Sequence, residues 1–203
     1  ICALGVSAFA ADSDLAYVKD KGVLIVGITD YAPMDYKDEN GQWIGFDADY
    51  AKAVCEKLGV TAEFKEIEWD YKLIALEAKD IDCVWNGMTI TEEGKLNASI
   101  SDPYVINAQV VVMKSDAVGN YPDAASLAGL TFAVESGSAG EAALTDLGIT
   151  EYVALQDQTS ALMEVAAGTS DAAVIDSLMA AAMVGGLMLT RLTKLMNLPA
   201  VTA

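Results

Sequence analysis

The chain has 203 residues, with 12 Lys or Arg against 30 Asp or Glu, which gives a formal net charge of −18. This charge argues against a nucleic-acid partner, because nucleic-acid binding rests on clustered cations, and self-repulsion favours a monomer. The sequence has no His and three Cys, which excludes His-based acid–base catalysis and zinc sites of four Cys and His ligands, so we expect no catalytic residue, metal or cofactor.

Residues 1–10 (ICALGVSAFA) are uncharged and end in small residues, and polar residues follow from Asp12. This pattern is typical of the end of a secretory signal peptide, so we predict a signal-peptide remnant over 1–10, in a sequence that begins inside its reading frame. A buried first strand is the alternative. Cys2 is a poor candidate for a lipid anchor, because apolar residues continue after it.

Strands and helices are predicted to alternate from residue 23 onward. Residues 23–28 (VLIVGI) form an apolar, β-branched run typical of a buried strand. Apolar residues recur at helical spacing over 46–58, where Asp47 can cap the helix and Gly59 can end it. Further strands are predicted over 60–67, 81–85 and 109–113, and a helix over 70–78.

The alternation starts again after residues 113–123, which contain Gly119 and Pro122 and have linker character. Strands are predicted over 131–134, 152–155 and 172–175, and helices over 138–147, 159–167 and from Asp176 onward. Such alternation predicts parallel α/β units with right-handed crossovers. We therefore predict two α/β lobes with a cleft between them, lobe 1 over 11–113 and lobe 2 over 114–184.

The C-terminal stretch has a different composition. Residues 177–203 contain no Asp or Glu, and they contain Arg191, the only Arg of the sequence. The uncharged run 177–190 is shorter than the about 20 residues that a membrane-spanning helix needs. We predict a truncated or frameshifted terminus in which 185–203 is an aberrant tail that does not pack as a native element. An amphipathic terminal helix is the alternative.

In open α/β sheets, ligands bind beyond the carboxyl ends of the strands. That rule selects the residues 29–31, 69, 85–89, 135–140 and 176.

The same positions carry a family resemblance. The blocks are VGITDYAPMDYKDENGQWIGFDADYAKAV, IDCVWNGMTIT, SDPY, FAVESGSAGEAAL and DAAVID. In order and spacing they resemble the extracellular solute-binding proteins of amino-acid ABC importers, the polar amino-acid-binding family (family 3). The resemblance runs from about residue 24 to residue 176. It implies a type II periplasmic-binding-protein-like fold of open, mostly parallel sheets, which closes on a free amino acid in the periplasm or outside the cell and delivers it to a membrane permease.

The resemblance also implies how the ligand's backbone is held. Asp176 matches the acid that receives the α-ammonium, and a purely capping role is the alternative. The backbone at Asn86 and Gly87 and the hydroxyl of Thr89 match contacts to the amino and carboxylate groups, and an ordinary turn is the alternative.

A predicted helix starts near Ser138 and Ala139, whose free amides are suited to a carboxylate. A plain capping turn is the alternative. Tyr31 and Trp69 match the positions that clamp the ligand side chain, although core packing is the commoner fate of a Trp.

Glu135 lies where family members vary with their ligand. An acid there, with Asp30 nearby in the predicted site, hints at a polar or cationic ligand side chain.

The sequence departs from the family pattern in two places. The family places an Arg after the TIT block, where it holds the ligand carboxylate through a bidentate fork, but this sequence has Gly94 there and Lys95 next to it. After residue 185 nothing resembles the segment that returns to lobe 1, so lobe 1 is predicted to be incomplete and to expose apolar area.

Cys55 and Cys83 both fall in lobe 1, where export would permit a disulfide, but both also suit small buried positions. Three functions remain open from the sequence: an amino-acid-binding protein without catalysis, an exported enzyme of the same fold similar to cyclohexadienyl dehydratase, and a damaged product that binds nothing.

Overall fold

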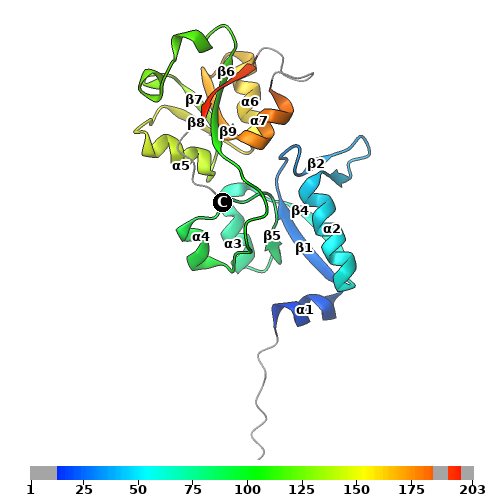
Figure 1. The fold of residues 1–203 in the computed structure, drawn as a ribbon. Helices are drawn as coiled ribbons and strands as arrows, with labels where there is room; N and C mark the ends of the chain where they lie inside the picture. Colours follow the sequence, from blue (N-terminus) through cyan, green and yellow to red (C-terminus); the bar gives the residue numbers. More distant parts are fainter. Residues whose placement is uncertain (1–12, 185–191, 198–203) are drawn as a thin grey trace, which may run out of the picture.

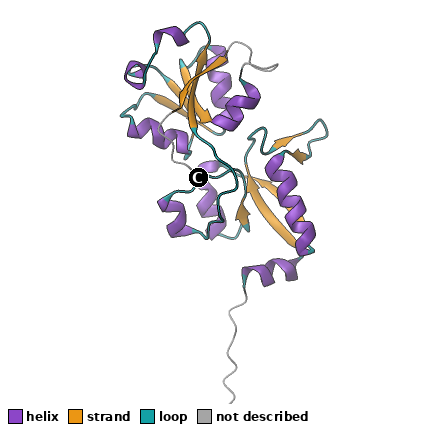
Figure 2. Cartoon of the chain, viewed as in Figure 1, coloured by secondary structure: helices purple, strands orange, loops and turns teal. Residues whose placement is uncertain are grey.

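The computed structural model describes residues 13–184 and 192–197. The predicted signal-peptide remnant and Cys2 lie outside these residues. Two lobes, each with its own sheet, are joined by an extended segment (Figure 1). Helices lie against both sheets (Figure 2), as the predicted two-lobe α/β fold requires. Among the described residues, no helix is both long and apolar enough to cross a membrane.

Lobe 1 is built on a three-stranded parallel sheet in the order β4-β1-β5. Its buried core is a small cluster that includes Val26, Ile28 and Ala51. The elements of lobe 1 are α1 (Asp14–Lys21), β1 (Val23–Ile28), β2 (Tyr36–Lys37), β3 (Trp43–Ile44), α2 (Phe46–Leu58), β4 (Thr61–Glu66), the 3-10 helix η1 (Trp69–Tyr71), α3 (Lys72–Glu77), β5 (Cys83–Val84) and α4 (Glu92–Asn97).

The start of α2 differs from the prediction. The N-cap residue is Gly45, with φ of 117°, and Asp47 lies inside the helix as a buried residue. The carbonyl oxygens of Pro33 and Met34 accept hydrogen bonds from the amides of Phe46 and Asp47, at 3.1 and 2.9 Å. Because these carbonyls already satisfy the first helical amides, no side-chain cap is needed. A Cβ atom on Gly45 would lie 2.3 Å from the Met34 oxygen, so the chain needs glycine there.

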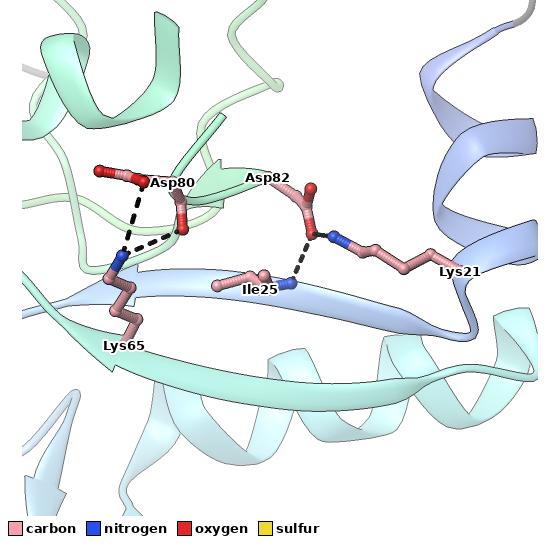
Figure 3. A network of polar contacts seen from close by, with 5 residues as sticks. All are labelled: Lys21, Ile25, Lys65, Asp80 and Asp82. Carbon is pink, nitrogen blue, oxygen red and sulfur yellow. Dashed lines mark hydrogen bonds and ion pairs between the residues drawn. The ribbon is translucent and has the colours of Figure 1, made fainter. Parts of the chain in front are cut away.

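Asp82 ties α1 to the lobe 1 sheet (Figure 3). Its Oδ2 atom lies 2.6 Å from Lys21 Nζ and accepts a hydrogen bond of 2.7 Å from the Ile25 amide. The hydrogen bond with Asp82 raises the pKa of the Lys21 ammonium. A second pair in this view, Lys65 with Asp80, is exposed and longer, at 3.9 Å. The shorter, partly buried Lys21–Asp82 contact is therefore expected to contribute more to stability than the exposed pair.

Lobe 2 is built on a five-stranded sheet in the order β10-β6-β9-β7-β8. Strands β7, β8 and β9 are parallel, whereas β6 runs antiparallel to both β9 and β10. The elements of lobe 2 are β6 (Gln109–Lys114), the 3-10 helices η2 (Val118–Asn120) and η3 (Ala124–Leu127), β7 (Phe132–Glu135), α5 (Ala139–Asp146), β8 (Tyr152–Leu155), α6 (Gln158–Ala167), β9 (Ala172–Asp176), α7 (Ser177–Met183) and β10 (Leu192–Asn197).

Successive side chains of β6 point to opposite faces of the lobe 2 sheet. Val110 and Val112 belong to the apolar cluster that α6 and α7 cover. Val111 and Met113 belong to a second cluster, on the face that α5 and η3 cover. This alternation with a period of two explains why the strand reads as a continuous apolar run: it is buried on both faces.

The place of β6 corrects a sequence-based prediction. The sequence assigns residues 109–113 to lobe 1, but β6 pairs with β9 in the lobe 2 sheet, with Gln109 opposite Asp176. The predicted linker over 113–123 therefore begins inside a strand. The physical reason is that an apolar run reveals a strand but not its direction or its neighbours, so an antiparallel strand at the start of lobe 2 looks like one at the end of lobe 1.

The prediction that residues 185–203 do not pack as a native element is wrong for Leu192–Asn197. These residues form β10, which pairs with β6 from Lys114 to Val110. Without β10, the second edge of β6 would carry unpaired backbone groups, so any extended segment that reaches it gains ladder hydrogen bonds. The remaining predicted tail, 185–191 and 198–203, lies outside the described residues.

A cavity of about 870 Å³ lies beside β5 in lobe 1. Apolar side chains that line it include Val18, Leu76, Ile81, Ile100 and Tyr104. Val18 and Ile81 of this lining are buried, so the exposed apolar area that the sequence predicts for lobe 1 stays a prediction.

Cys55 and Cys83, which the sequence leaves open as a disulfide, carry free thiols. Cys55 is buried in α2, and Cys83 is half-buried in β5. Burial raises the pKa of both thiols, that of Cys83 to about 12. Both therefore stay protonated at neutral pH, in the form that does not attack a disulfide.

Candidate functional site

A cavity of about 410 Å³ lies between the two lobes. Residues of the loop 86–89 in lobe 1 and of the loop 135–140 in lobe 2 both line it, as predicted for loops that face each other across a cleft. The predicted site residues that line it are Tyr31, Trp69, Asn86, Gly87, Thr89, Glu135, Ser138, Ala139 and Asp176. The carboxyl ends of strands from both sheets thus meet at one hollow.

Asp30 differs from the other predicted residues, because it is exposed and does not line this cavity. Its neighbours Thr29 and Tyr31 are buried and do line it. Successive side chains of extended chain point to opposite sides, so a segment that directs Thr29 and Tyr31 inward turns Asp30 away.

Asp176 is the last residue of β9 and the N-cap residue of α7, but its side chain makes no capping hydrogen bond. The carboxylate instead accepts hydrogen bonds from three amide side chains. Oδ1 accepts from Asn107 and, at 2.8 Å, from Gln109, and Oδ2 accepts from Gln158. Burial raises the pKa of Asp176, and the three amides oppose that shift. The amides hold the carboxylate in place and leave acceptor capacity on Oδ2.

Glu135, at the end of β7, is buried with 3% of its surface exposed. Its Oε2 atom lies 3.4 Å from Gln158 Nε2, and its Oε1 atom has no hydrogen-bond partner among the described residues. Burial and the nearby charge of Asp176 raise its pKa to about 8. Glu135 is therefore largely protonated at neutral pH when no ligand cation lies next to it.

On the lobe 1 side, both polar atoms of the Asn86 side chain form hydrogen bonds within the protein. Its Oδ1 atom accepts from the amide and hydroxyl of Thr29, at 3.2 and 2.7 Å. Its Nδ2 atom donates to the Thr29 carbonyl oxygen and, at 2.7 Å, to Asp35. Asp35 is completely buried, and desolvation raises its pKa to about 7. Asn86 thus joins the ends of β1 and β5 and offers the cavity only its backbone.

Tyr31 contacts Gly87 closely. A Cβ atom on Gly87, whose φ is 58°, would lie 2.9 Å from Tyr31 Cε1. The Tyr31 side chain is buried, and its hydroxyl has no partner among the described residues. Desolvation, and then the charge of Asp176, raise its pKa. Tyr31 therefore presents a neutral hydroxyl near Asp176.

Trp69 and Lys72, which also belong to lobe 1, form another part of the cavity wall. Lys72 Nζ lies 4.7 Å from the centroid of the Trp69 ring and donates to the Trp69 carbonyl oxygen at 3.1 Å. The same ammonium donates across the cleft to the Gly137 carbonyl oxygen at 3.0 Å. Desolvation lowers the pKa of Lys72. The wall therefore combines an aromatic face with a cation that bridges the lobes.

The start of α5 closes the site on the lobe 2 side. Ser138 is the N-cap residue, and its hydroxyl accepts from the Glu141 amide at 3.2 Å. Glu141 folds back and accepts from the Gly137 amide at 2.7 Å. The amides of the first helical turn, beginning at Ala139, have no acceptor within the helix and lie at its positive end. This end of α5 suits an anionic group.

Gly94 lies in α4, is buried and lines the cavity. Its amide donates to the Thr91 hydroxyl at 3.0 Å. A Cβ atom there would meet the ends of the side chains of Ile100, Thr91 and Met88 at 3.1, 3.3 and 3.4 Å. A Cβ atom at position 94 therefore needs shifts of a few tenths of an ångström in these side chains.

Sequence reasoning missed the amide side chains around Asp176 and the Lys72 bridge. Gln158 comes just after β8, so the rule of strand carboxyl ends could have found it. Asn107 lies just before β6, and Gln109 is the first residue of that strand. Because β6 runs antiparallel to β9, the start of β6 lies at the edge of the sheet where the parallel strands end. That placement has no signal in a single sequence. Within the described residues, no group of His, Cys, Asp or Glu is placed to hold a metal ion.

The sequence matches the model of a family described as bacterial extracellular solute-binding proteins, family 3, over residues 24–181. It is 35% identical over 178 residues to the L-arginine-binding protein of Pseudomonas aeruginosa, covering 86% of this chain and 68% of that protein. It is 30% identical over 182 residues to the L-cystine-binding protein TcyJ of Escherichia coli (strain K12), covering 89% of this chain and 68% of that protein. The chain thus spans about two thirds of the length of these relatives.

Solved structures show the same fold. The arginine-bound form of truncated ArgBP from T. maritima matches with a TM-score of 0.84 and 34% identity, over 91% of this chain and 86% of that chain. The ancestral amino-acid-binding protein AncCDT-1, a precursor of cyclohexadienyl dehydratase, matches with a TM-score of 0.82 and 33% identity, over 93% of this chain and 84% of that chain.

Proposed function

Because the chain belongs to the bacterial extracellular solute-binding proteins of family 3, we propose that it binds a free polar amino acid outside the cytoplasmic membrane and delivers it to the permease of an ABC importer. In this proposal the protein acts as a monomer and catalyses no reaction. The observation that carries the proposal is the cavity of about 410 Å³ between the lobes, which gathers side chains from the strand ends of both sheets. A volume of this size suits a small, largely enclosed ligand.

The site residues are proposed to divide the ligand's groups between them. Asp176 binds the α-ammonium, because its carboxylate is fixed by three amides and retains acceptor capacity. The start of α5 at Ser138 and Ala139, with the Thr89 hydroxyl, binds the α-carboxylate. Tyr31 and Trp69 enclose the side chain, and backbone groups at Asn86 and Gly87 complete the lobe 1 face.

Calorimetric titration against the twenty common amino acids tests this proposal, with Asp176→Asn as the decisive variant. Asn retains the shape but lacks the charge that pairs with an ammonium, so we expect a loss of at least about tenfold in affinity for every ligand that binds. Asp116→Asn, in an exposed turn, is the matched control and is expected to bind as the unchanged protein does. Equal binding by Asp176→Asn and the control would contradict the proposed role.

One observation supports a second candidate, an enzyme similar to cyclohexadienyl dehydratase. Glu135 is a buried cavity carboxyl whose pKa is raised to about 8, and a group protonated at neutral pH can act as a general acid. Incubation with prephenate, followed by absorbance and mass spectrometry, separates the two functions. The binding proposal predicts no turnover, whereas turnover that Glu135→Gln abolishes would establish the enzyme.

A further inference from the structure

Glu135 presents an unsatisfied buried oxygen next to the cavity. The residue lines the cavity, only 3% of its surface is exposed, and Oε1 has no hydrogen-bond partner among the described residues. Its other oxygen has only the long contact with Gln158 at 3.4 Å. Asp176, by contrast, already accepts from three amides. A buried polar atom without a partner is costly, so the Glu135 carboxyl gains more from a ligand group than the Asp176 carboxylate does.

The charges that line the cavity favour a ligand with a net positive charge. The acids that line it are Asp70, Glu93, Glu135 and Asp176, and the one base is Lys72, so even with Glu135 protonated the acids exceed the bases by 3 − 1 = 2. Lys72 forms no ion pair with Glu135 among the described residues, because its hydrogen bonds go to two carbonyl oxygens, and its charge opposes the raised pKa of Glu135 without cancelling the shift. An amino acid with a neutral side chain brings no net charge to this cavity, whereas a basic one brings one positive charge.

The cavity already holds a cation against an aromatic face. Lys72 Nζ lies 4.7 Å from the centroid of the Trp69 ring, a geometry in which the ring attracts a positive charge. Trp69 itself is buried, with 8% of its surface exposed. The Trp69 ring therefore already has a cation of the protein over it, and it offers the ligand an apolar surface for the aliphatic stem of a side chain whose charged end lies at Glu135.

We infer that the ligand is a basic amino acid and that Glu135 binds the cationic group of its side chain. This inference rests on the proposed function and adds the class of side chain and the residue that selects it. The ligand's ammonium or guanidinium donates to Oε1, and the pair forms inside the cavity, where it is shielded from water.

A proton leaves Glu135 when this pair forms. The groups that act on the Glu135 carboxyl are Asp176 and Asp157, which raise its pKa, Lys72 and Gln158, which lower it, and the neutral hydroxyl of Tyr31. With its pKa at about 8, the carboxyl is mostly protonated at pH 7 before the ligand binds, and a ligand cation favours the ionised form. Affinity for a basic ligand therefore rises with pH up to about 8 and levels off above it.

The experiment compares two near-isosteric pairs, arginine with citrulline and lysine with norleucine, by calorimetry on the full chain and on Glu135→Gln. We expect the unchanged protein to prefer the charged member of each pair by at least about tenfold and Glu135→Gln to lose most of that preference while retaining affinity for the neutral member. Titrations in phosphate and in Tris at pH 7 are expected to report release of close to one proton per arginine, and none for Glu135→Gln. The exposed Glu151→Gln is the matched control and keeps the preference.

Three outcomes overturn the inference. Equal affinity for charged and neutral members would show that the side-chain site is not selective for a cation. An equal loss for both members in Glu135→Gln would assign Glu135 to the α-ammonium. Loss of the preference in Asp30→Asn but not in Glu135→Gln would place the cation at Asp30. In each case some amino acid still binds, whereas failure of every amino acid to bind would refute the proposed function itself.

Discussion

Lys72 Nζ lies 3.0 Å from the carbonyl oxygen of Gly137, which joins α3 of lobe 1 to the β7–α5 loop of lobe 2 across the cavity. The same ammonium donates to Trp69 within lobe 1. A hydrogen bond to a charged donor contributes more than a neutral one, and the partial burial of this one protects it from screening. The contact therefore favours the closed arrangement of the lobes.

Lys72→Met is expected to open the protein in the absence of ligand. Met keeps most of the aliphatic stem against Trp69 but removes the donor that reaches Gly137. Small-angle X-ray scattering should show a larger radius of gyration for this variant than for Lys57→Met, which changes an exposed Lys of α2. Scattering curves that superimpose for the two variants would show that the Lys72 contact does not hold the lobes together.

Gly137→Ala is expected to weaken ligand binding by at least about tenfold, because closure to the described arrangement becomes impossible. A Cβ atom on Gly137 would lie 2.7 Å from Asp70 Cα and 2.5 Å from its Oδ1 atom, across the cleft. Gly148→Ala is the matched control: Gly148 has a φ of 72°, close to the 67° of Gly137, and nothing lies within 4 Å of its Cβ position. Both variants bear the same backbone strain, so an equal loss of affinity in both would rule out the clash.

Gly94→Arg is expected to tighten binding of amino acids by ~30- to 3,000-fold, by supplying a bidentate partner for the α-carboxylate. The chain as it stands is expected to bind weakly, because the start of α5 and Thr89 supply only part of that compensation. Gly94→Ala separates the guanidinium from the effect of adding a Cβ atom to a crowded helix position. Tight binding by the unchanged chain that Gly94→Arg leaves the same or weakens would show that this position does not hold the carboxylate.

Asp35→Asn is expected to stabilise the fold above about pH 7. The folded state raises the pKa of Asp35 from 3.8 to about 7, so between these values the folded protein holds a proton that the unfolded chain has lost. Stability from this group is therefore full below about pH 4, falls as the pH rises towards 7, and is constant above that. The shift corresponds to at most about 4 kcal/mol at pH 8. Asn at this position keeps an acceptor for Asn86 and does not titrate.

The measurement for Asp35→Asn is the free energy of unfolding by urea at several pH values from about 4 to 8. Other buried acids, Glu135 and Asp176 among them, titrate in both proteins, so the difference between variant and unchanged protein reports Asp35 together with its charged neighbour Asp47. A constant difference across this range would mean that Asp35 is already ionised in the folded state.

Much of this fold follows from local pattern. The apolar run at 23–28 and the helical spacing at 46–58 agree with β1 and α2 as observed. The direction of β6 could not be predicted, because its pairing with β9 is decided by contacts between residues such as Val111 and Val174, far apart in the chain. The rule that ligands bind at the carboxyl ends of strands identifies Glu135 and Asp176, which end parallel strands. It does not identify Gln109, because Gln109 begins the antiparallel strand β6.

The proposed assignment places most contacts to the ligand's charged groups on one lobe, and lobe 1 adds only the Thr89 hydroxyl to them. Asp176, Glu135 and the start of α5 all belong to lobe 2, whereas Tyr31 and Trp69 belong to lobe 1. A charged ligand can therefore dock on lobe 2 first, at a rate that increases with ligand concentration and falls with added salt. Lobe 1 then closes over the bound ligand, in a step whose rate does not depend on ligand concentration. In stopped-flow mixing, the observed rate would rise with concentration and then reach a plateau set by that closing step alone.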